Sequence, residues 1–319
     1  MHKIVVLDGY TLNPGDISWE ELKTYGEVIL YDRTEPEDVI QRIGDCDIVL
    51  TNKTLLTGEM IQTCPNIRYI GCLSTGYNVV DLKTAGEWGI VVTNIPSYGT
   101  EAVAQHTMAL LLEIASKVGM HSDAVHAGQW TECSDFCFWN APLFELAGKT
   151  MGIIGYGAIG QAVGRKAEAF NMEVLAYSPS MPAGMESEHC HKASIEEIYE
   201  KADVITLHCP LNEENKEMIN KETIEKMIPG VIILNTGRGG LIRETDLKEA
   251  LNSGRVGAAG LDVASSEPIS ADNPLLQAKN LWLTPHIAWA ARETRQRLMD
   301  MAIDNVRAFT EGHPIHQVN

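Results

Sequence analysis

A glycine-rich segment behind a short apolar run constrains the fold of this chain more than any other feature. The apolar residues Met151–Ile154 lead into Gly-Tyr-Gly-Ala-Ile-Gly at 155–160, and a pattern with helical spacing follows. Such a turn between a strand and a helix is typical of a dinucleotide-binding βαβ unit, although a purely structural turn is the alternative. In the dinucleotide-binding unit, Gly155 permits the tight turn, Gly157 lets the backbone approach a pyrophosphate, and Gly160 lets the helix pack closely on the strand.

Short apolar runs alternate with helical patterns along the whole chain. In the first hundred residues the predicted strands are Ile4–Asp8, Val28–Tyr31, Ile48–Thr51, Tyr69–Cys72 and Ile90–Thr93. From residue 150 onward they are Met151–Ile154, Glu173–Tyr177, Val204–His208, Val231–Asn235, Val256–Leu261 and Leu281–Thr284. This alternation predicts parallel sheets with crossover helices, and six strands match a doubly wound dinucleotide-binding fold. A length of 319 residues favours two domains.

Three further segments stand out between and after these strands. Residues 101–120 have apolar side chains at helical spacing and predict one long helix that links the two domains. Residues 289–311 predict a closing helix that returns to the first domain. Residues 128–144 hold three of the five Phe and two of the six Trp. This aromatic density predicts a subunit interface, and a cluster packed on its own subunit is the alternative.

The balance of charge excludes several partners. The chain has 25 Lys and Arg against 43 Asp and Glu, which gives a net charge of −18. Nucleic acid and anionic membranes attract clustered basic residues, so neither is an expected partner. The apolar run Ile4–Leu7 ends at Asp8 and is too short for a signal peptide or a membrane span. We therefore expect a cytoplasmic protein.

The seven cysteines are scattered and odd in number, which predicts free thiols rather than a disulfide framework. Cys133 and Cys137 flank three residues, and His189-Cys190-His191 superficially resembles a ligand cluster. Neither group has partner residues at the spacing of a zinc site. We therefore expect no metal.

Polar residues follow the predicted strands in the last third of the chain. Arg238 follows one strand, Asp262 and Glu267 follow the next, and His286 follows the last. Carboxyl ends of parallel strands are where such folds place their sites. An arginine fork suits a carboxylate, and a histidine paired with a carboxylate is a tunable proton carrier. Each residue also has a plainer interpretation, as a turn residue, a charge at a helix start or a capped histidine.

These elements occur in the order found in the D-isomer-specific 2-hydroxyacid dehydrogenases, and the chain resembles this family from its first strand to its last helix. The resemblance implies that Arg238 clamps the substrate, that His286 is the acid–base group, and that Glu267 pairs with this histidine. It implies that Asp262 lies near the nicotinamide amide and that Ser74-Thr75-Gly76 cradles the substrate carboxylate.

The resemblance also implies the cofactor and the residues that bind it. The cofactor is NAD, with NADP not excluded. The implied cofactor-binding residues are Gly155, Tyr156, Gly157, Ala158, Ile159, Gly160, Ser178, His208, Cys209, Pro210, Thr236, Gly237, Arg238, Asp262 and His286. The chain departs from the family at Gly237, where alanine is more common, and at Ser178, where NAD-using members usually have aspartate. No Arg or Lys lies between Tyr177 and His191, so no local clamp for a 2′-phosphate is evident.

The implied architecture is α/β, with two doubly wound parallel-sheet domains. Residues 1–100 and 289–319 form a flavodoxin-like substrate domain, and residues 101–288 form a Rossmann dinucleotide-binding domain inserted into it. Closure of one domain on the other excludes water in this architecture. By analogy with dimeric relatives, we expect a homodimer.

The expected function is hydride transfer between a nicotinamide and C2 of a small D-2-hydroxy acid or 2-oxo acid. Leu7-Asp8-Gly9-Tyr10 and residues 74–78 resemble the glycerate dehydrogenases, also called hydroxypyruvate reductases, so D-glycerate and hydroxypyruvate, or glyoxylate, are the expected substrates. A formate-dehydrogenase-like reaction is disfavoured because that branch has glutamine in place of Glu267. The alternative is an NADH-sensing, corepressor-like binding protein of the same fold without significant turnover.

Overall fold

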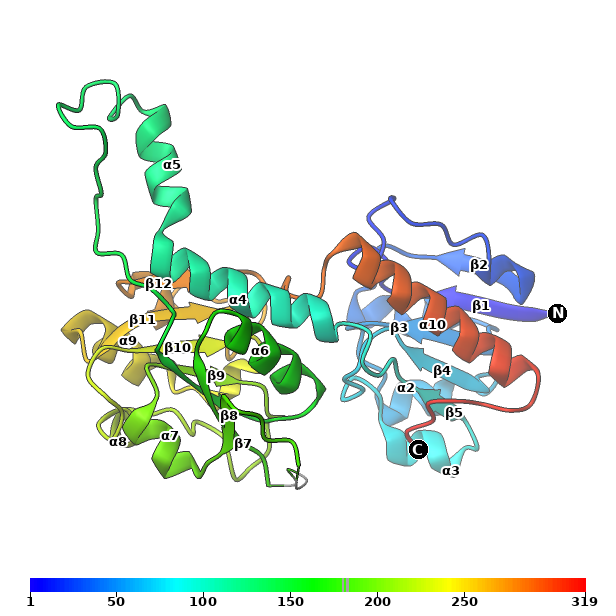
Figure 1. Ribbon diagram of the computed structural model, residues 1–319. Coiled ribbons are helices and arrows are strands. Elements are labelled where there is room, and N and C mark those ends of the chain that lie inside the picture. Colours follow the sequence, from blue (N-terminus) through cyan, green and yellow to red (C-terminus); the bar gives the residue numbers. More distant parts are fainter. Residues whose placement is uncertain (180, 182–183) are drawn as a thin grey trace. The chain divides into compact units, whose positions relative to one another are not determined.

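A computed structural model describes residues 1–179, 181 and 184–319 of the chain (Figure 1). The chain divides into two compact units, which consist of residues 1–99 with 289–319 (unit 1) and residues 100–288 (unit 2). Each unit is a parallel sheet with helices on both faces. The predicted fold class is confirmed. No helix in the described part of the chain is long and apolar enough to cross a membrane.

Unit 1 is built on a five-stranded parallel sheet in the order β2-β1-β3-β4-β5, which is the flavodoxin-like order. Its strands are β1 (His2–Val6), β2 (Gly26–Leu30), β3 (Ile48–Thr51), β4 (Tyr69–Cys72) and β5 (Val91–Thr93). Its helices are α1 (Val39–Ile43), α2 (Gly58–Thr63), α3 (Leu82–Glu87) and α10 (Arg292–Thr310), with 3-10 turns at Leu22–Thr24 and Pro36–Asp38.

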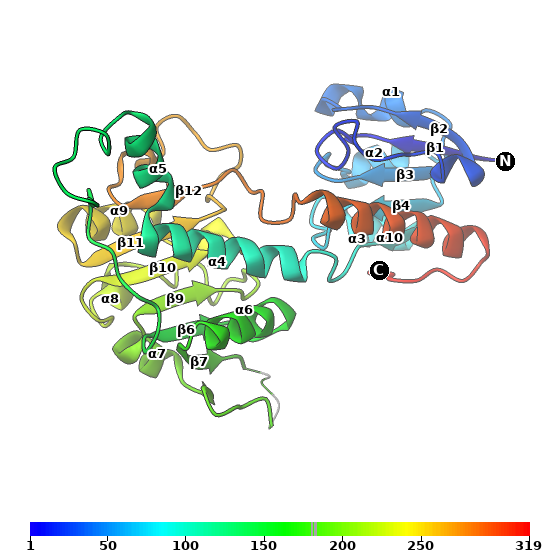
Figure 2. The same ribbon diagram turned by 45° about the horizontal axis from the view of Figure 1, so that its top comes forward.

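The faces of this sheet are covered by different helices because successive side chains of a strand point to opposite sides. Val5 and Val49 pack with α1, α2 and α3, whereas Ile4 and Ile48 pack with the apolar stripe of α10. The red helix α10 in Figure 2 therefore belongs to the core of unit 1, although it is the last helix of the chain.

Unit 2 is built on a seven-stranded parallel sheet in the order β12-β11-β10-β9-β6-β7-β8. Its strands are β6 (Thr150–Ile154), β7 (Glu173–Tyr177), β8 (Cys190–Lys192), β9 (Val204–Leu207), β10 (Val231–Asn235), β11 (Val256–Leu261) and β12 (Leu281–Leu283). Its helices are α4 (Thr100–Ser116), α5 (Val118–His126), α6 (Ala158–Ala169), α7 (Ile195–Lys201), α8 (Lys221–Ile224) and α9 (Glu244–Ser253), with 3-10 turns at Gly239–Leu241 and Pro274–Gln277.

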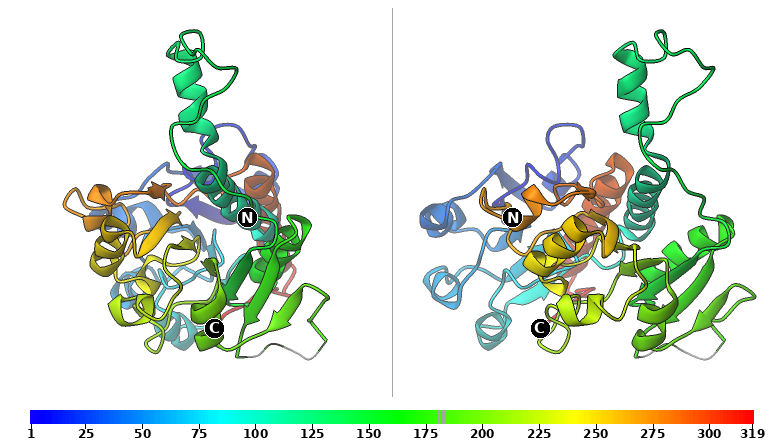
Figure 3. Two further views of the ribbon diagram at one scale, coloured as in Figure 1. Left: turned by 60° about the vertical axis from the view of Figure 1, so that its left-hand side comes forward. Right: turned by 90° about the vertical axis from the view of Figure 1, so that its left-hand side faces the viewer.

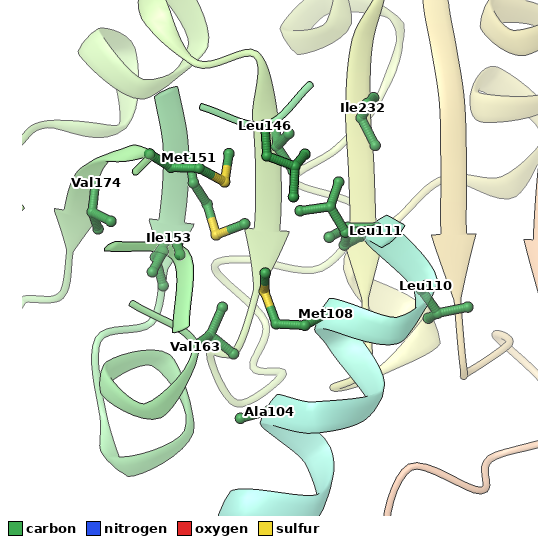
Figure 4. Close-up of a cluster of buried hydrophobic side chains, with 14 of the residues drawn as sticks. Ala104, Met108, Leu110, Leu111, Leu146, Met151, Ile153, Val163, Val174 and Ile232 are labelled. Carbon is green, nitrogen blue, oxygen red and sulfur yellow. The ribbon is translucent and has the colours of Figure 1, made fainter. Parts of the chain in front are cut away.

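The direction of the chain across this sheet reverses beside β6, and this is where doubly wound folds bind their ligands. Helices α4 and α6 pack on one face, where Met108 and Leu111 of α4 meet Met151 and Ile232 of the sheet (Figure 4). Helices α7, α8 and α9 cover the other face. All seven carboxyl ends lie at one edge because the strands are parallel.

Two details of the predicted elements are wrong. The sheet of unit 2 has seven strands rather than six, because β8 is a three-residue edge strand with one buried side chain, Cys190, and so has no apolar run. The single helix expected over 101–120 is two helices, because the backbone at Lys117 is left-handed, with φ +48°. Helix α5 therefore runs in a different direction from α4.

Helix α5 and the loop after it form a projecting arm, residues 118–143, that extends away from the rest of unit 2 (Figures 1 and 3). Helix α5 has no buried residue. On the loop, the side chains of Trp130, Phe136 and Trp139 are 52%, 89% and 69% exposed. These apolar groups are not covered by the chain's own described residues.

Candidate active site

The glycine turn after β6 combines close packing on one side with open space on the other. Gly155 has φ +102°, and a Cβ there would lie 2.4 Å from the Cys209 nitrogen. A Cβ on Gly160 would lie 2.2 Å from the Gly155 oxygen, whereas a Cβ on Gly157 would meet nothing within 4 Å. The first turn of α6 has no side-chain cap. The N–H groups of this turn therefore have no side-chain cap, and such groups at a helix N-terminus can bind the pyrophosphate of a dinucleotide.

Two of the three predicted cofactor residues after β9, His208 and Cys209, lie directly against this turn. His208 donates its backbone N–H to the Ile154 oxygen at 2.8 Å, and Cys209 touches Gly155. Burial lowers the pKa of His208 to about 4, and its ring Nε2 lies 2.9 Å from the Thr206 hydroxyl. His208 is therefore neutral near pH 7 and adds no charge for a phosphate. Pro210 follows, exposed.

Ser178 directly follows β7. The glycine turn is hydrogen-bonded to the end of this strand, because the Gly155 N–H donates to the Tyr177 oxygen at 2.8 Å. The Ser178 hydroxyl has no partner among the described residues. On the neighbouring strand β8, Lys192 pairs in register with Ala176. Lys192, a basic residue, therefore lies on the edge strand β8, opposite a residue two positions before Ser178.

The loop after β10 presents Arg238 at the same edge of the sheet. Asn235 shapes this turn, because its side chain accepts from Gly237 N–H at 3.0 Å and donates to the Arg238 oxygen at 2.8 Å. The exposed Arg238 guanidinium contacts only the Gly237 oxygen, at 2.8 Å, and no carboxylate of the described residues lies within ion-pair distance of it. This fork is available for an anion.

Gly239 brings the Arg238 turn against the segment that carries Glu267. A Cβ at Gly239 would lie 2.0 Å from the Ala264 carbonyl carbon, so only glycine fits between the two loops. Sequence analysis did not assign Gly239 or Glu244 to the site. The Glu244 carboxylate accepts from the Ser265 N–H at 2.7 Å and from the Asn273 side chain at 2.8 Å, and so supports this segment.

Glu267 and His286 form a direct pair. The His286 Nδ1 lies 2.6 Å from Glu267 Oε2, and Glu267 Oε1 accepts from the Ala264 N–H at 3.1 Å. An ionised carboxylate only accepts hydrogen bonds, so Nδ1 carries a proton and Nε2 is the atom left to exchange one with a ligand. The backbone of His286 has a left-handed conformation, with φ +55°. About a third of each side chain is exposed.

Asp262 follows β11 and is completely buried. Its Oδ1 accepts from the Thr284 hydroxyl at 2.6 Å and from Ile287 N–H at 2.9 Å, and its Oδ2 accepts from Ala288 N–H at 2.8 Å. The carboxylate therefore holds the segment on both sides of His286.

Two residues of α4 that sequence analysis did not assign also reach this edge. His106 Nε2 lies 3.0 Å from the Thr284 hydroxyl, and the Thr107 hydroxyl lies 3.0 Å from that of Thr236. Neither residue belongs to a local motif, so no sequence signal singled them out.

The predicted substrate loop, Ser74-Thr75-Gly76, lies in unit 1 after β4. Its shape is held by side chains, because the Ser74 hydroxyl donates to the Gly76 oxygen at 2.6 Å and the Thr75 hydroxyl donates to the Ile95 oxygen at 2.8 Å. The backbone N–H groups of these three residues donate to no acceptor in the described part of the chain. Such consecutive amides favour an anion.

All seven cysteines are free thiols. Within residues 1–179, 181 and 184–319, no three His, Cys, Asp or Glu side chains are grouped as metal ligands.

Comparisons with known proteins show the family of this chain. The family model for the D-isomer specific 2-hydroxyacid dehydrogenase NAD binding domain matches residues 108–288. The chain is 57% identical to a hydroxypyruvate reductase of Blautia hydrogenotrophica, over 99% of each chain. The chain belongs to the D-isomer specific 2-hydroxyacid dehydrogenase family. The prediction of an NAD(P)-dependent dehydrogenase of this family is therefore confirmed, and the corepressor-like alternative is not favoured.

Two solved structures with this dehydrogenase fold contain a nicotinamide cofactor. One is a D-lactate dehydrogenase from Lactobacillus jensenii with NAD⁺, at 27% identity and a TM-score of 0.82 over 99% of each chain. The other is an NADPH-dependent glyoxylate/hydroxypyruvate reductase from Sinorhizobium meliloti, solved with NADP and malonate. It is 27% identical with a TM-score of 0.83, and the match covers 99% of this chain and 96% of that one.

Proposed function

We propose that this dehydrogenase reduces hydroxypyruvate to D-glycerate with NADH and catalyses the reverse oxidation, with glyoxylate as a second substrate. The observation that carries the proposal is the His286–Glu267 pair, which lies at the same sheet edge as the unpaired Arg238 fork and the glycine turn. The relative with 57% identity is named for hydroxypyruvate reduction. Unit 1 is assigned as the substrate domain and unit 2 as the dinucleotide-binding domain.

Each side chain has a definite task in this reaction. A nicotinamide cofactor held at the glycine turn would supply the hydride for C2. Arg238 binds the substrate carboxylate and stabilises the negative charge that grows on the C2 oxygen. Protonated His286 donates from Nε2 to that oxygen, while Glu267 orients the ring through Nδ1. In unit 1, the amides of residues 74–76 are donors for a carboxylate.

A substrate panel tests the proposal. Purified protein is mixed with NADH and, in turn, hydroxypyruvate, glyoxylate and pyruvate, and NADH absorbance is followed. We expect the highest kcat/KM with hydroxypyruvate. Tight NADH binding without turnover of any 2-oxo acid would instead indicate a dinucleotide-gated binding protein.

We propose in addition that the projecting arm buries its aromatic side chains against a second copy of the chain. Exposed aromatic groups in such number are typical of subunit interfaces. Light scattering at low micromolar concentration should give twice the chain mass of 35.1 kDa. Phe136→Ser should shift this mass toward the monomer, whereas Phe170→Ser, at a half-exposed phenylalanine outside the arm, should not. A monomeric wild-type protein would refute the dimer.

NADH is expected to be preferred over NADPH, by about tenfold in kcat/KM, or about 1.4 kcal/mol. A 2′-phosphate needs Arg or Lys donors, but Glu186 and Glu188 follow β7, and Glu186 accepts from the backbone N–H of Lys192 at 3.1 Å. Ser178 offers a ribose only a neutral hydrogen bond, so the preference is modest. Ser178→Asp should increase it, because the carboxylate accepts from the ribose diol and repels the phosphate.

Steady-state kinetics with both cofactors measure this preference. Ser178→Asn is the matched control, since it adds an acceptor of similar size without charge. A higher kcat/KM with NADPH in the wild type would contradict the prediction, and a basic group, either Lys192 beside the end of β7 or one from a distant loop, would then have to reach the phosphate.

A further inference from the structure

Helix α4 contacts two strand ends through consecutive polar side chains. His106 Nε2 lies 3.0 Å from the hydroxyl of Thr284, which follows β12. The hydroxyl of Thr107 lies 3.0 Å from that of Thr236, which follows β10. Thr284 and Thr236 each stand two residues before a side chain with a proposed catalytic role. The two contacts therefore connect α4 to both loops that carry the proposed chemistry.

The hydrogen bonds around Thr284 run in one direction. Its hydroxyl donates to Asp262 Oδ1 at 2.6 Å, in preference to the Leu261 oxygen at 3.4 Å. A hydroxyl has a single hydrogen, so Thr284 accepts from His106, which therefore carries a proton on Nε2. The same Nε2 lies 3.5 Å from Asp262 Oδ1. His106 is thus the outer donor of a chain that ends on a buried carboxylate.

This carboxylate determines the backbone around His286. Asp262 accepts from the N–H groups of Ile287 and Ala288, at 2.9 Å and 2.8 Å, and from Thr284 on the other side. His286 has φ +55°, and a non-glycine residue keeps such a backbone only where its surroundings hold it. The bonds to Asp262 provide that restraint.

The second contact has the same character. Thr107 is fully buried, and its hydroxyl donates to the Val103 oxygen at 2.9 Å, so it accepts from Thr236. Thr236 begins the turn that presents Arg238. The apolar side chains of α4 already pack the helix on the sheet, so these polar contacts are additional to the packing.

We propose that His106 and Thr107 are positioning residues of the dehydrogenase. His106 orients the His286 loop through Thr284 and Asp262, and Thr107 fixes the Arg238 turn through Thr236. The proposal rests on the proposed roles of His286 and Arg238. It assigns the two residues different kinetic effects, because one acts on the proton donor and the other on the substrate clamp.

Hydrogen–deuterium exchange and kinetics of His106→Leu test the first part. We expect the amides of Ile287 and Ala288 to exchange about tenfold faster. We also expect kcat for hydroxypyruvate to fall about tenfold with the KM for NADH unchanged, and the solvent deuterium isotope effect on kcat to increase. His106→Gln, which keeps an N–H donor, should restore most of kcat. Gln105→Leu, at the exposed neighbour on α4, should leave both measurements unchanged.

Thr107→Val tests the second part, since it removes only the hydroxyl. We expect kcat/KM for hydroxypyruvate to fall about fivefold, through both a higher KM and a lower kcat, because the Arg238 fork acts on both. Thr107→Ser keeps the hydroxyl and should resemble the wild type. If His106→Leu does not fold, Thr284→Val and Thr284→Ser form the equivalent pair, with the same exchange and kinetic measurements.

Several outcomes would overturn the inference. Unchanged exchange at residues 287–288 together with unchanged kcat in His106→Leu would show that His106 positions nothing. Loss of thermal stability in this variant without a change in kcat or isotope effect would show a merely structural role. A wild-type protein that reduces no 2-oxo acid refutes the proposed function instead, and the exchange experiment then still decides whether α4 anchors the loop.

Discussion

His286→Ala is expected to lower kcat/KM for hydroxypyruvate reduction by at least about a hundredfold, roughly 2.7 kcal/mol of transition-state stabilisation. The imidazole Nε2 is the proposed proton donor, and the 2.6 Å contact between Nδ1 and Glu267 keeps the ring oriented for this transfer. Alanine removes the donor and the ring that contacts Glu267 Oε2. NADH binding should change little, and this can be measured separately by fluorescence titration.

A second histidine–glutamate pair provides the matched control. His189 Nδ1 lies 2.9 Å from Glu173 Oε1, at the start of β8 and thus at the opposite edge of the sheet. His189→Ala should therefore keep wild-type activity. Near-wild-type turnover of His286→Ala would exclude the acid–base role.

Arg238→Ala is expected to have an effect of similar size, again at least about a hundredfold in kcat/KM. The guanidinium forms no ion pair within the described residues, so its removal leaves no buried charge behind and should hardly affect the free energy of unfolding. The loss should appear in both KM and kcat, because the fork binds the carboxylate and also stabilises the developing oxyanion.

Arg238→Lys separates charge from geometry. Lysine keeps the positive charge but cannot bind a carboxylate with two parallel hydrogen bonds, so we expect only partial recovery. Arg243→Ala removes an exposed arginine from the same region, where it pairs with Glu217 at 2.8 Å, and serves as the control. If Arg238→Ala reduced hydroxypyruvate as fast as Arg243→Ala does, the clamp would have to be another residue.

Much of the fold could be predicted from the sequence, because buried parallel strands are continuous apolar runs. The predicted bounds of β3, β4, β7, β10 and β11 match the structure residue for residue. The features that sequence analysis missed have no such run. Strand β8 has two exposed residues out of three, and the apolar spacing of α4 continues into α5 past the left-handed Lys117.

The sequence by itself determined what is local at the site. The glycine turn consists of six consecutive residues, so the positions of its glycines predict its shape. The structure shows a steric reason for glycine at Gly155 and Gly160. Arg238, Glu267 and His286 follow strands whose carboxyl ends meet at one edge of a parallel sheet. Their common location is therefore a consequence of strand order, which the alternation of elements predicts.

Only the tertiary structure decided how these groups are held. His106 and Thr284 are 178 positions apart, and Thr107 and Thr236 are 129 apart, so no periodicity or spacing rule connects them. Asp262, assigned from the family to the nicotinamide, has both oxygens bonded to the His286 segment. Such contacts form because burial of α4 on the sheet brings polar groups together, and a buried polar group must find a partner from whatever part of the chain lies beside it.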